Sequence, residues 1–375
     1  MIVTSGKMCI FFVCTLLLIG SSSGYAAKSN QSIYEDPYDV AAGGASLTRA
    51  SQEGVLFSNP ALMPFGNKFF RWFGSQFSLI AAKESIEFGQ SLASGSATSD
   101  SGGSEEEETA EREKFIDDVF TTPIHFGATS ALSFISSHFG VGVVSRFEPD
   151  IKGTRFSDTG IPAIRAQAEG YGAGVVSYAQ KLFPWFSLGV TGKYIYKAEP
   201  NIYLDFADQA RIDEIRSNPQ ALINEVTPGQ GLGFDAGALL FLQGRSVDYR
   251  MAVKVDDFGN TTFTESQEPF KQIIHGGVGL TFHNSIDSLH LSLDFRDVAG
   301  AYEESVVMRS YAGAKLVLRN YIGFAAGLYQ GYPSYGIRLD LIIVKLGLTY
   351  YAREMGSFIG DDRRNIYIAY FGFGI

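Results

Sequence analysis

From residue 68 onward, the chain alternates apolar and polar residues with a period of two. Leu289, Leu291 and Leu293, for example, alternate with His290 and Ser292. Side chains with this period lie on opposite faces of a β-strand. Fourteen such segments can be counted, which predicts an all-β protein. The predicted strands cover residues 68–82, 122–134, 137–148, 165–181, 185–199, 229–243, 246–257, 269–283, 287–297, 305–318, 321–330, 334–344, 345–355 and 363–375.

Charged residues of the predicted strands gather on one face. In segment 246–257, Tyr249, Met251 and Val253 fall opposite Arg250 and Lys254. A soluble, half-buried sheet shows the same separation, so alternation alone does not distinguish a soluble sheet from a membrane barrel.

The connections between the predicted strands make that distinction. Those after the even-numbered strands are short, such as 135–136 and 319–320, whereas those after the odd-numbered strands are longer, except 331–333. An up-and-down antiparallel barrel in an outer membrane has tight periplasmic turns and longer outer loops. Closure also removes the unpaired strand edges that lipid does not tolerate. We therefore predict that residues 68–375 form a transmembrane β-barrel of about 14 strands in a bacterial outer membrane.

The N-terminus has the three zones of a secretory signal peptide. Lys7 precedes an apolar run at 8–20, and the small residues of SSSGYAA follow. This pattern predicts a signal peptide over residues 1–26, cleaved after Ala26, with a retained N-terminal anchor as the alternative. Cys9 and Cys14 both lie in this segment, so the exported chain is expected to have no disulfide and no thiolate site.

Residues 27–67 differ from the strands that follow them. They are rich in small residues, with a Gly-Gly pair early and an Asn-Pro pair late, so we expect short helical pieces and tight turns. Alone, such a segment would stay mobile, but inside a polar lumen it would find partners. We therefore predict a plug whose charged residues pair with the wall and whose residues 55–57 cover an apolar pocket. The residues expected to build it are Gly43, Gly44, Arg49, Glu53, Phe57, Asn59 and Pro60.

Two of the predicted outer loops are long. Residues 83–121 pass from a Ser/Gly-rich stretch into an acidic run that begins at Glu105, and residues 200–228 carry apolar residues at near-helical spacing. The second loop is therefore expected to be helical, and both are expected to contribute to a lid. The acidic run lacks the spacing of a calcium loop and the histidines lack that of metal ligands, so we predict no metal and no cofactor.

Particular stretches resemble the FadL family of outer-membrane transporters of hydrophobic compounds. The first is DPYDVAAGGASLTRASQEGVLFSNPAL, in which Asn59-Pro60-Ala61 stands just before the first strand. The stretches LDFRD, AAGLYQGYPSYGIRLDL and YYAREMGSFIGDDRR resemble the TraF-like, spirochaete and PorV-related branch. This resemblance implies a fourteen-stranded barrel closed by an N-terminal plug, which takes up hydrophobic or amphipathic molecules such as long-chain fatty acids and releases them sideways.

A fatty-acid carboxylate would need a cation beside an apolar pocket. The alternative is that lumen arginines and lysines pair with lumen acids and brace the barrel and the plug. In the third strand, Gly140 and Gly142 would permit a kink of the wall for sideways exit. The candidate lumen cations are Lys193, Arg250, Lys254, Arg296, Arg309 and Arg338.

Other functions are less well supported by the sequence. One alternative is a barrel that serves as a partner or shuttle in protein secretion or conjugation, with a secreted protein bound to it. An enzyme is not expected, because a Ser292–His290 pair would need a third orienting group. A net charge of −10 without a basic stripe argues against nucleic acid. The expected partners are a hydrophobic ligand, outer-membrane lipid and the barrel assembly machinery, which recognises aromatic terminal strands such as 363–375.

Overall fold

The computed structural model describes residues 32–52, 54–65, 70–93, 122–154, 163–199, 201–205, 208–217, 227–265, 267–284, 287–302, 305–356 and 358–374. The predictions for the signal peptide, for Glu53 and for the acidic run that begins at Glu105 fall outside these residues.

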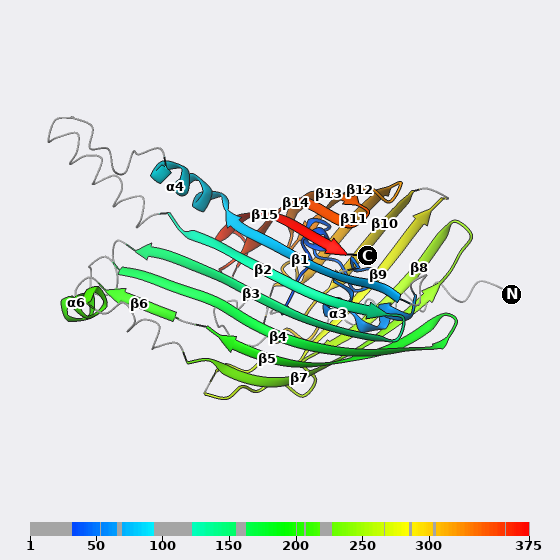
Figure 1. Cartoon of the computed structure of the whole chain (residues 1–375), viewed down its shortest axis with the longest axis horizontal. Coiled ribbons are helices and arrows are strands. Elements are labelled where there is room, and N and C mark those ends of the chain that lie inside the picture. The colour runs from blue at the N-terminus through cyan, green and yellow to red at the C-terminus, as the bar shows by residue number, and fades with distance from the viewer. Residues whose placement is uncertain are drawn as a thin grey trace.

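Fourteen antiparallel strands close into a barrel, as predicted (Figure 1). Strands that follow one another in the chain are paired, and β1 closes the ring against β15, where Ser78 lies opposite Tyr370. A further short strand, β6, pairs with β4 beyond the end of β5. The strands are β1 (Phe70–Ala82), β2 (Ile124–Ser136), β3 (Phe139–Thr154), β4 (Ala163–Phe183), β5 (Phe186–Ala198), β6 (Asn201–Asp205), β7 (Gly229–Leu242), β8 (Val247–Asp256), β9 (Ile273–His283), β10 (Ser288–Phe295), β11 (Ser310–Leu318), β12 (Ile322–Tyr329), β13 (Tyr332–Leu341), β14 (Val344–Glu354) and β15 (Arg363–Gly374).

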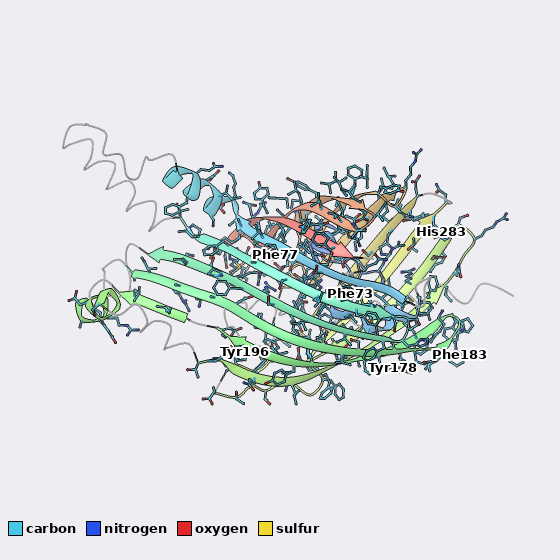
Figure 2. The ribbon with its side chains drawn as sticks, viewed as in Figure 1. Phe73, Phe77, Tyr178, Phe183, Tyr196 and His283 are labelled. Atoms are coloured by element: carbon cyan, nitrogen blue, oxygen red, sulfur yellow. The ribbon has the colours of Figure 1, made fainter. Side chains whose placement is uncertain are left out.

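The predicted separation of the two faces is confirmed. On β10, Leu289, Leu291 and Leu293 are exposed on the outside, whereas His290 and Ser292 are buried in the lumen. Aromatic side chains stand around the outer wall, as Figure 2 shows for the labelled residues Phe73, Phe77, Tyr178, Phe183 and Tyr196. This outer surface is apolar, as a lipid-facing barrel requires.

The eighth and tenth predicted strands, 269–283 and 305–318, begin a few residues later than expected, as β9 and β11. Before β9, the chain from 257 to 272 forms an outer loop in which Thr261 bridges to Phe270. Phe270 is buried in the lumen, where it packs on Tyr171 of β4. Apolar residues that look like the start of a strand in the sequence therefore belong to an inward-folded loop.

The prediction of a helix over 200–228 is only partly correct. Residues 201–205 form β6 instead, because β4 extends past the end of β5 and offers unpaired backbone groups to this stretch. Helix α6 (Gln209–Ser217) follows, and residues 218–226 lie outside the described part of the chain. At the start of the first long loop, helix α4 (Lys83–Ala93) continues directly from β1. Among the described residues, no helix is long and apolar enough to span a membrane.

Residues 32–52 and 54–65, called here the lumen segment, lie inside the barrel (Figure 1). They form helix α2 (Pro37–Ala41), helix α3 (Val55–Ser58) and the 3-10 helix η1 (Pro60–Phe65). The segment packs into apolar clusters with the wall on both sides. One cluster joins Leu56 and Met63 to strands β2 to β8, and another joins Val40 and Ala45 to tyrosines of β11, β12 and β14.

Candidate functional site

Helix α2 begins at a capping residue and ends in a glycine turn. The Asp36 carboxylate accepts hydrogen bonds from the backbone N–H groups of Tyr38 (2.9 Å) and Asp39 (3.3 Å), which satisfies donors that a helix N-terminus leaves open. After the helix, Gly43 and Gly44 have φ of +69° and +73°. Only glycine adopts this conformation without a steric cost, so the pair reverses the chain.

The glycine turn also fits against glycines of the wall. A Cβ on Gly43 would lie 2.1 Å from the carbonyl oxygen of Ala312, and a Cβ on Gly313 would lie 1.9 Å from that of Ala42. The two backbones therefore touch, and neither position has room for a side chain. The Ser334 hydroxyl also accepts from the N–H of Gly43 (3.0 Å) and donates to the carbonyl oxygen of residue 41 (3.1 Å).

Asn59 organises the end of the lumen segment. Its Nδ2 donates to the carbonyl oxygen of Leu47 (3.1 Å), and its Oδ1 accepts from the N–H of Ala61 (3.0 Å). Gly237 of β7 leaves the space for this amide, since a Cβ there would lie 2.2 Å from Oδ1. Gly189 of β5 leaves comparable space for Pro60.

Phe57 packs in the lumen core. Its ring lies 4.9 Å from that of Tyr34, and both residues belong to the buried cluster on the β2 to β8 side. Val55 and Leu56 are buried in the same cluster, and a cavity of about 20 Å³ has Leu56 and Phe57 in its lining. The larger apolar pocket expected beneath residues 55–57 stays a prediction.

Gly140 and Gly142 do not kink the third strand. The β3 ladder pairs both glycines regularly with β2 and β4. Their lack of a side chain makes room for Leu56, whose methyl carbons lie 2.2 Å and 3.2 Å from the two ideal Cβ positions. The β2–β3 pairing keeps one register but omits Phe126 and Gly127, which lie between His125 and Ala128 and opposite Glu148 and Pro149. Pro149 has no N–H to donate to a ladder, which explains an interruption there.

The six candidate cations all have protein partners, although Lys254 shares one cavity lining with Arg296 and another with Lys193. Lys193 contacts Asp235 (2.7 Å) and Asp257 (2.9 Å), both on the wall side. Lys254 contacts Asp256 (2.6 Å) and donates to the carbonyl oxygen of Phe57 (2.9 Å). These contacts correspond to the bracing role given above as the alternative.

The four arginines are engaged in a similar way. Arg250 donates to the carbonyl oxygen of Thr48 (3.2 Å), and Arg296 pairs with Glu35 and donates to the carbonyl oxygen of Gly44. The other two contact wall groups: Arg309 donates to the Asp297 carbonyl oxygen (3.1 Å) and Arg338 pairs with Asp340 (3.0 Å). The structure does not bring the six cations together into one anion site.

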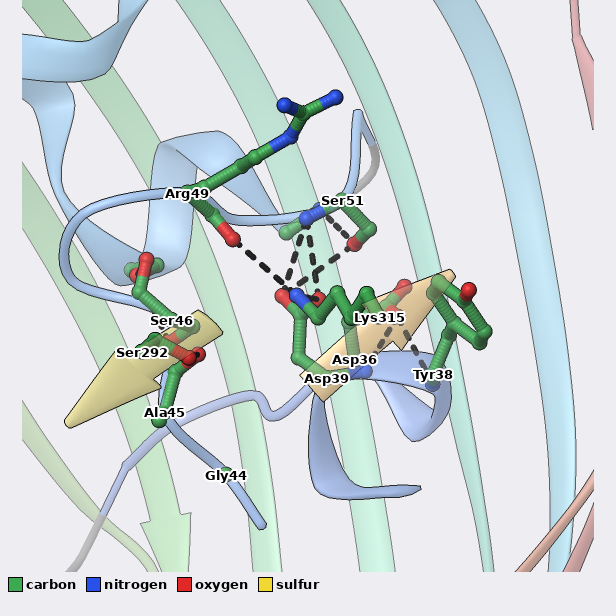
Figure 3. Close-up of polar contacts among 12 residues, drawn as sticks. Asp36, Tyr38, Asp39, Gly44, Ala45, Ser46, Arg49, Ser51, Ser292 and Lys315 are labelled. Atoms are coloured by element: carbon green, nitrogen blue, oxygen red, sulfur yellow. Dashed lines mark hydrogen bonds and ion pairs between the residues drawn. The ribbon is translucent and has the colours of Figure 1, made fainter. Parts of the chain in front are cut away.

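Figure 3 shows an ion pair that the sequence did not predict. The Lys315 ammonium of β11 donates to the Asp39 carboxylate of α2 and to the carbonyl oxygen of Arg49 (3.1 Å). Asp39 also accepts from the N–H of Ser51 (3.0 Å). Arg49, expected to pair through its side chain, thus contributes its carbonyl group. The period-two pattern places Lys315 on the inward face of its strand, which indicates a lumen residue. No local pattern in the sequence identifies its partner.

Two further acids hold the lumen segment. The Asp294 carboxylate of β10 accepts from the N–H groups of Ser46 (2.7 Å) and Leu47 (2.9 Å). Glu35 binds Arg296 and the hydroxyl of Tyr329 (2.8 Å). Burial alone would raise the pKa of Glu35, but Arg296 and Tyr329 hold this pKa below its ordinary value of 4.5.

The lumen segment leaves little free volume. Between it and strands β8 to β10 lies a cavity of about 40 Å³ that includes Glu35, Asp39, Asp256, His275 and Arg296 in its lining. A water needs about 10–15 Å³ of such volume and an apolar cavity that binds benzene is about 150 Å³. The cavity therefore suits a few waters, and an aromatic or acyl ligand requires the segment to move.

His290 and Ser292 do not form a nucleophile–base pair. The Ser292 hydroxyl donates to the carbonyl oxygen of Ala45 (3.2 Å), and Nδ1 of His290 lies 2.9 Å from the hydroxyl oxygen of Thr281. Both side chains therefore serve the packing of the lumen.

No family model and no curated protein match the chain. Solved structures do. The toluene transporter TbuX of Ralstonia pickettii has a TM-score of 0.50 and 10% identity, over 90% of this chain and 97% of that one. The P. putida toluene transporter TodX has a TM-score of 0.50 and 9% identity, over 92% and 99%. A deletion mutant of TodX, a monoaromatic hydrocarbon channel, has a TM-score of 0.51 and 9% identity, over 90% of this chain and 97% of that one.

The chain has the fold of these transport barrels. This confirms the architecture expected from the resemblance to FadL, while the narrower TraF-like branch stays a prediction. A closed barrel with an apolar outer surface is built for a bacterial outer membrane, in agreement with the predicted location.

Proposed function

We propose that this barrel moves hydrophobic or amphipathic small molecules through the outer membrane, and that the lumen segment is its plug. The observation that carries the proposal is that the segment fills the lumen, where the cavities described beside it are small, about 40 Å³ and about 20 Å³. Passage of a ligand then depends on displacement of the segment. The contacts that hold the segment to the wall therefore determine how readily the barrel opens.

Apolar ligands can compete for the contacts of the segment. Tyr34, Leu56 and Phe57 pack against lumen side chains such as Val175 and Tyr171. A ligand that occupies this apolar cluster replaces those contacts and binds only when the segment has shifted. Differential binding of this kind moves the closed–open equilibrium toward the open state.

The interruption of the β2–β3 ladder is the proposed sideways exit. The β2–β3 pairing omits Phe126 and Gly127, so fewer paired residues have to separate there for the wall to part. On its inner side, the Glu148 carboxylate contacts Arg146 (2.8 Å) and Arg353 (3.6 Å), so buried charge closes the seam. Release through the wall would deliver an apolar ligand to the membrane without crossing water.

Long-chain fatty acids and monoaromatic compounds are the substrate classes to compare. The similar barrels TbuX and TodX are toluene transporters. A fatty acid, unlike toluene, also requires a partner for its carboxylate. Because each of the six lumen cations contacts protein groups, a fatty acid has to displace an acid such as Asp256 from Lys254. An uncharged aromatic compound has no such requirement.

Uptake measurements test the proposal. Cells lacking the protein and cells expressing it would be compared for uptake of labelled toluene and labelled oleate, and the purified barrel would be extracted for mass spectrometry of bound lipid. We expect uptake of at least one label to depend on the protein. Transport would be contradicted if cells with and without the protein took up each label equally and the extract held no bound lipid. Recovery of a stoichiometric secreted protein instead would support the shuttle alternative.

A further inference from the structure

The turn between β13 and β14 presents apolar side chains at the short-turn end of the barrel. Leu341, Ile342 and Ile343 are all exposed, and Ile342, at 83%, is the most exposed large apolar residue of the described chain. Most other turns at this end carry polar residues at their tips, such as His138, Arg245, Asn284, Arg319 and Asn320.

The backbone of this turn is unfavourable for the residue it carries. Ile342 has φ of +62°, and the N–H of Ile343 donates to the carbonyl oxygen of Leu341 (2.6 Å). A β-branched residue at positive φ is strained, and glycine or asparagine is the usual choice. The neighbouring hairpin uses Asn320 at φ of +59°. An isoleucine held in this conformation needs surroundings that compensate the strain, and an apolar environment suits its side chain.

The apolar turn continues the lipid-facing surface. Going away from the turn, the outward residues of β13 are Leu341, Leu339, Ile337 and Tyr335, all exposed. Tyr335 stacks on Tyr350 of β14 with ring centroids 4.8 Å apart, and Tyr350 lies 5.2 Å from Tyr367 of β15. These three outward tyrosines form an aromatic row of the kind found at a membrane interface.

The distance from this aromatic row to the turn is short. Seven residues separate Tyr335 from Ile342, which at about 3.3 Å per residue gives about 23 Å along the strand. With a strand tilt of about 35–45°, the height is about 16–19 Å, against an apolar band of about 25 Å. The stretch from Tyr335 to Ile342 is therefore too short to cross the apolar band, if the tyrosines mark one interface of the membrane and the turn is to reach water at the other.

We infer that the Leu341–Ile343 turn is immersed in the acyl region of the periplasmic leaflet, and that the membrane is locally thinned on this side of the barrel. Lipid chains are the occupant that the surface fits, because no charged outward residue of β13 separates the turn from the lipid-facing band. When the apolar surface of a membrane protein is shorter than the hydrocarbon core, either the bilayer thins beside the protein or the ends of that surface are buried in the bilayer.

Single-cysteine variants test this placement. The exported chain is expected to contain no cysteine, so each variant carries a single one, and an environment-sensitive nitrobenzoxadiazole label is attached at Ile342→Cys, Leu339→Cys or Asn320→Cys. The full barrel is reconstituted in phosphatidylcholine vesicles with or without lipids that carry a nitroxide on the acyl chain. We expect the label at 342 to be quenched as strongly as the label at 339, and the label at 320 to be left nearly unquenched.

The contrary outcomes are distinct. A label at 342 that behaves like the label at 320 overturns the inference. A blue-shifted label at 342 without lipid quenching also overturns it, because a protein surface then covers the turn. A second measurement uses Ile342→Asp: the folded fraction, read from heat-dependent gel mobility, should fall in C18 bilayers but not in C12 bilayers. Asn320→Asp is the matched control, and an equal response of the two variants would contradict immersion.

Discussion

Lys315 on β11 and Asp39 in α2 form a buried ion pair that joins the barrel wall to the lumen segment (Figure 3). Asp39 in turn accepts the N–H of Ser51, so one lysine of the wall fixes two parts of the segment. Removing one partner of a buried pair leaves an uncompensated charge and typically costs about 3–5 kcal/mol. If the segment is the plug, loss of one partner destabilises the closed state of the barrel relative to the open state.

Lys315→Met is therefore expected to increase channel opening. Even about 1.4 kcal/mol of lost closed-state stability raises the open fraction about tenfold, which single-channel recording in planar bilayers would detect. Lys193→Met is the matched control, because Lys193 pairs with wall-side Asp235 and Asp257. Equal opening of the two variants would show that the Lys315 pair does not hold a gate.

Gly43→Ala is expected to displace the glycine turn from the wall. The new Cβ would lie 2.1 Å from the Ala312 carbonyl oxygen, at a φ of +69° that alanine disfavours. We expect faster proteolysis of the segment in the folded barrel and higher conductance. Gly174→Ala makes the same change on β4, where no atom lies within 4 Å of the ideal Cβ. Closed, protease-resistant Gly43→Ala channels would contradict the close packing of this turn.

Acid pH is expected to loosen the lumen segment through Glu35. Its pKa is lower in the folded protein than the ordinary value of 4.5, so its pairing with Arg296 contributes fully above that value and is lost as the pH falls through the folded pKa. Conductance should therefore rise below about pH 4.5. Glu35→Gln should already be more open at neutral pH and should lose part of this pH dependence. An unchanged pH profile in the variant would exclude Glu35 as the titrating group.

Ser292→Ala tests the remaining enzyme hypothesis. The hydroxyl donates to the Ala45 carbonyl oxygen (3.2 Å) and not to His290, so we expect no change in any background ester hydrolysis by the purified barrel. A lost hydrogen bond of this kind costs about 0.5–1.5 kcal/mol, which predicts a small rise in opening. Loss of a measurable lipase activity in Ser292→Ala would reverse this interpretation.

The barrel could be predicted because its information is local. A period of two identifies strands such as β15 from their own residues, and the inward parity of Asp294 and Arg296 is enough to place both side chains in the lumen. The helix expected at 200–228 was partly wrong for a non-local reason, since the free edge of β4 recruits Ile202 and Leu204 into β6.

The partners of the lumen segment could not be predicted. Asp39 and Lys315 are 276 residues apart, and many inward acids and cations along the strands were equally plausible partners. The match of Gly43 to Gly313 likewise depends on how two distant backbones meet. Sequence patterns specify which residues face inward, whereas packing decides which of them touch.

The lumen segment is proposed to close this barrel. The direct test is the conductance, in planar bilayers, of a variant lacking residues 32–65, compared with the complete protein. Heat-dependent gel mobility would first establish that the shortened barrel is folded. We predict a folded barrel that stays open, beside a complete protein that is closed most of the time. A folded barrel that conducts no more than the complete protein would contradict the account.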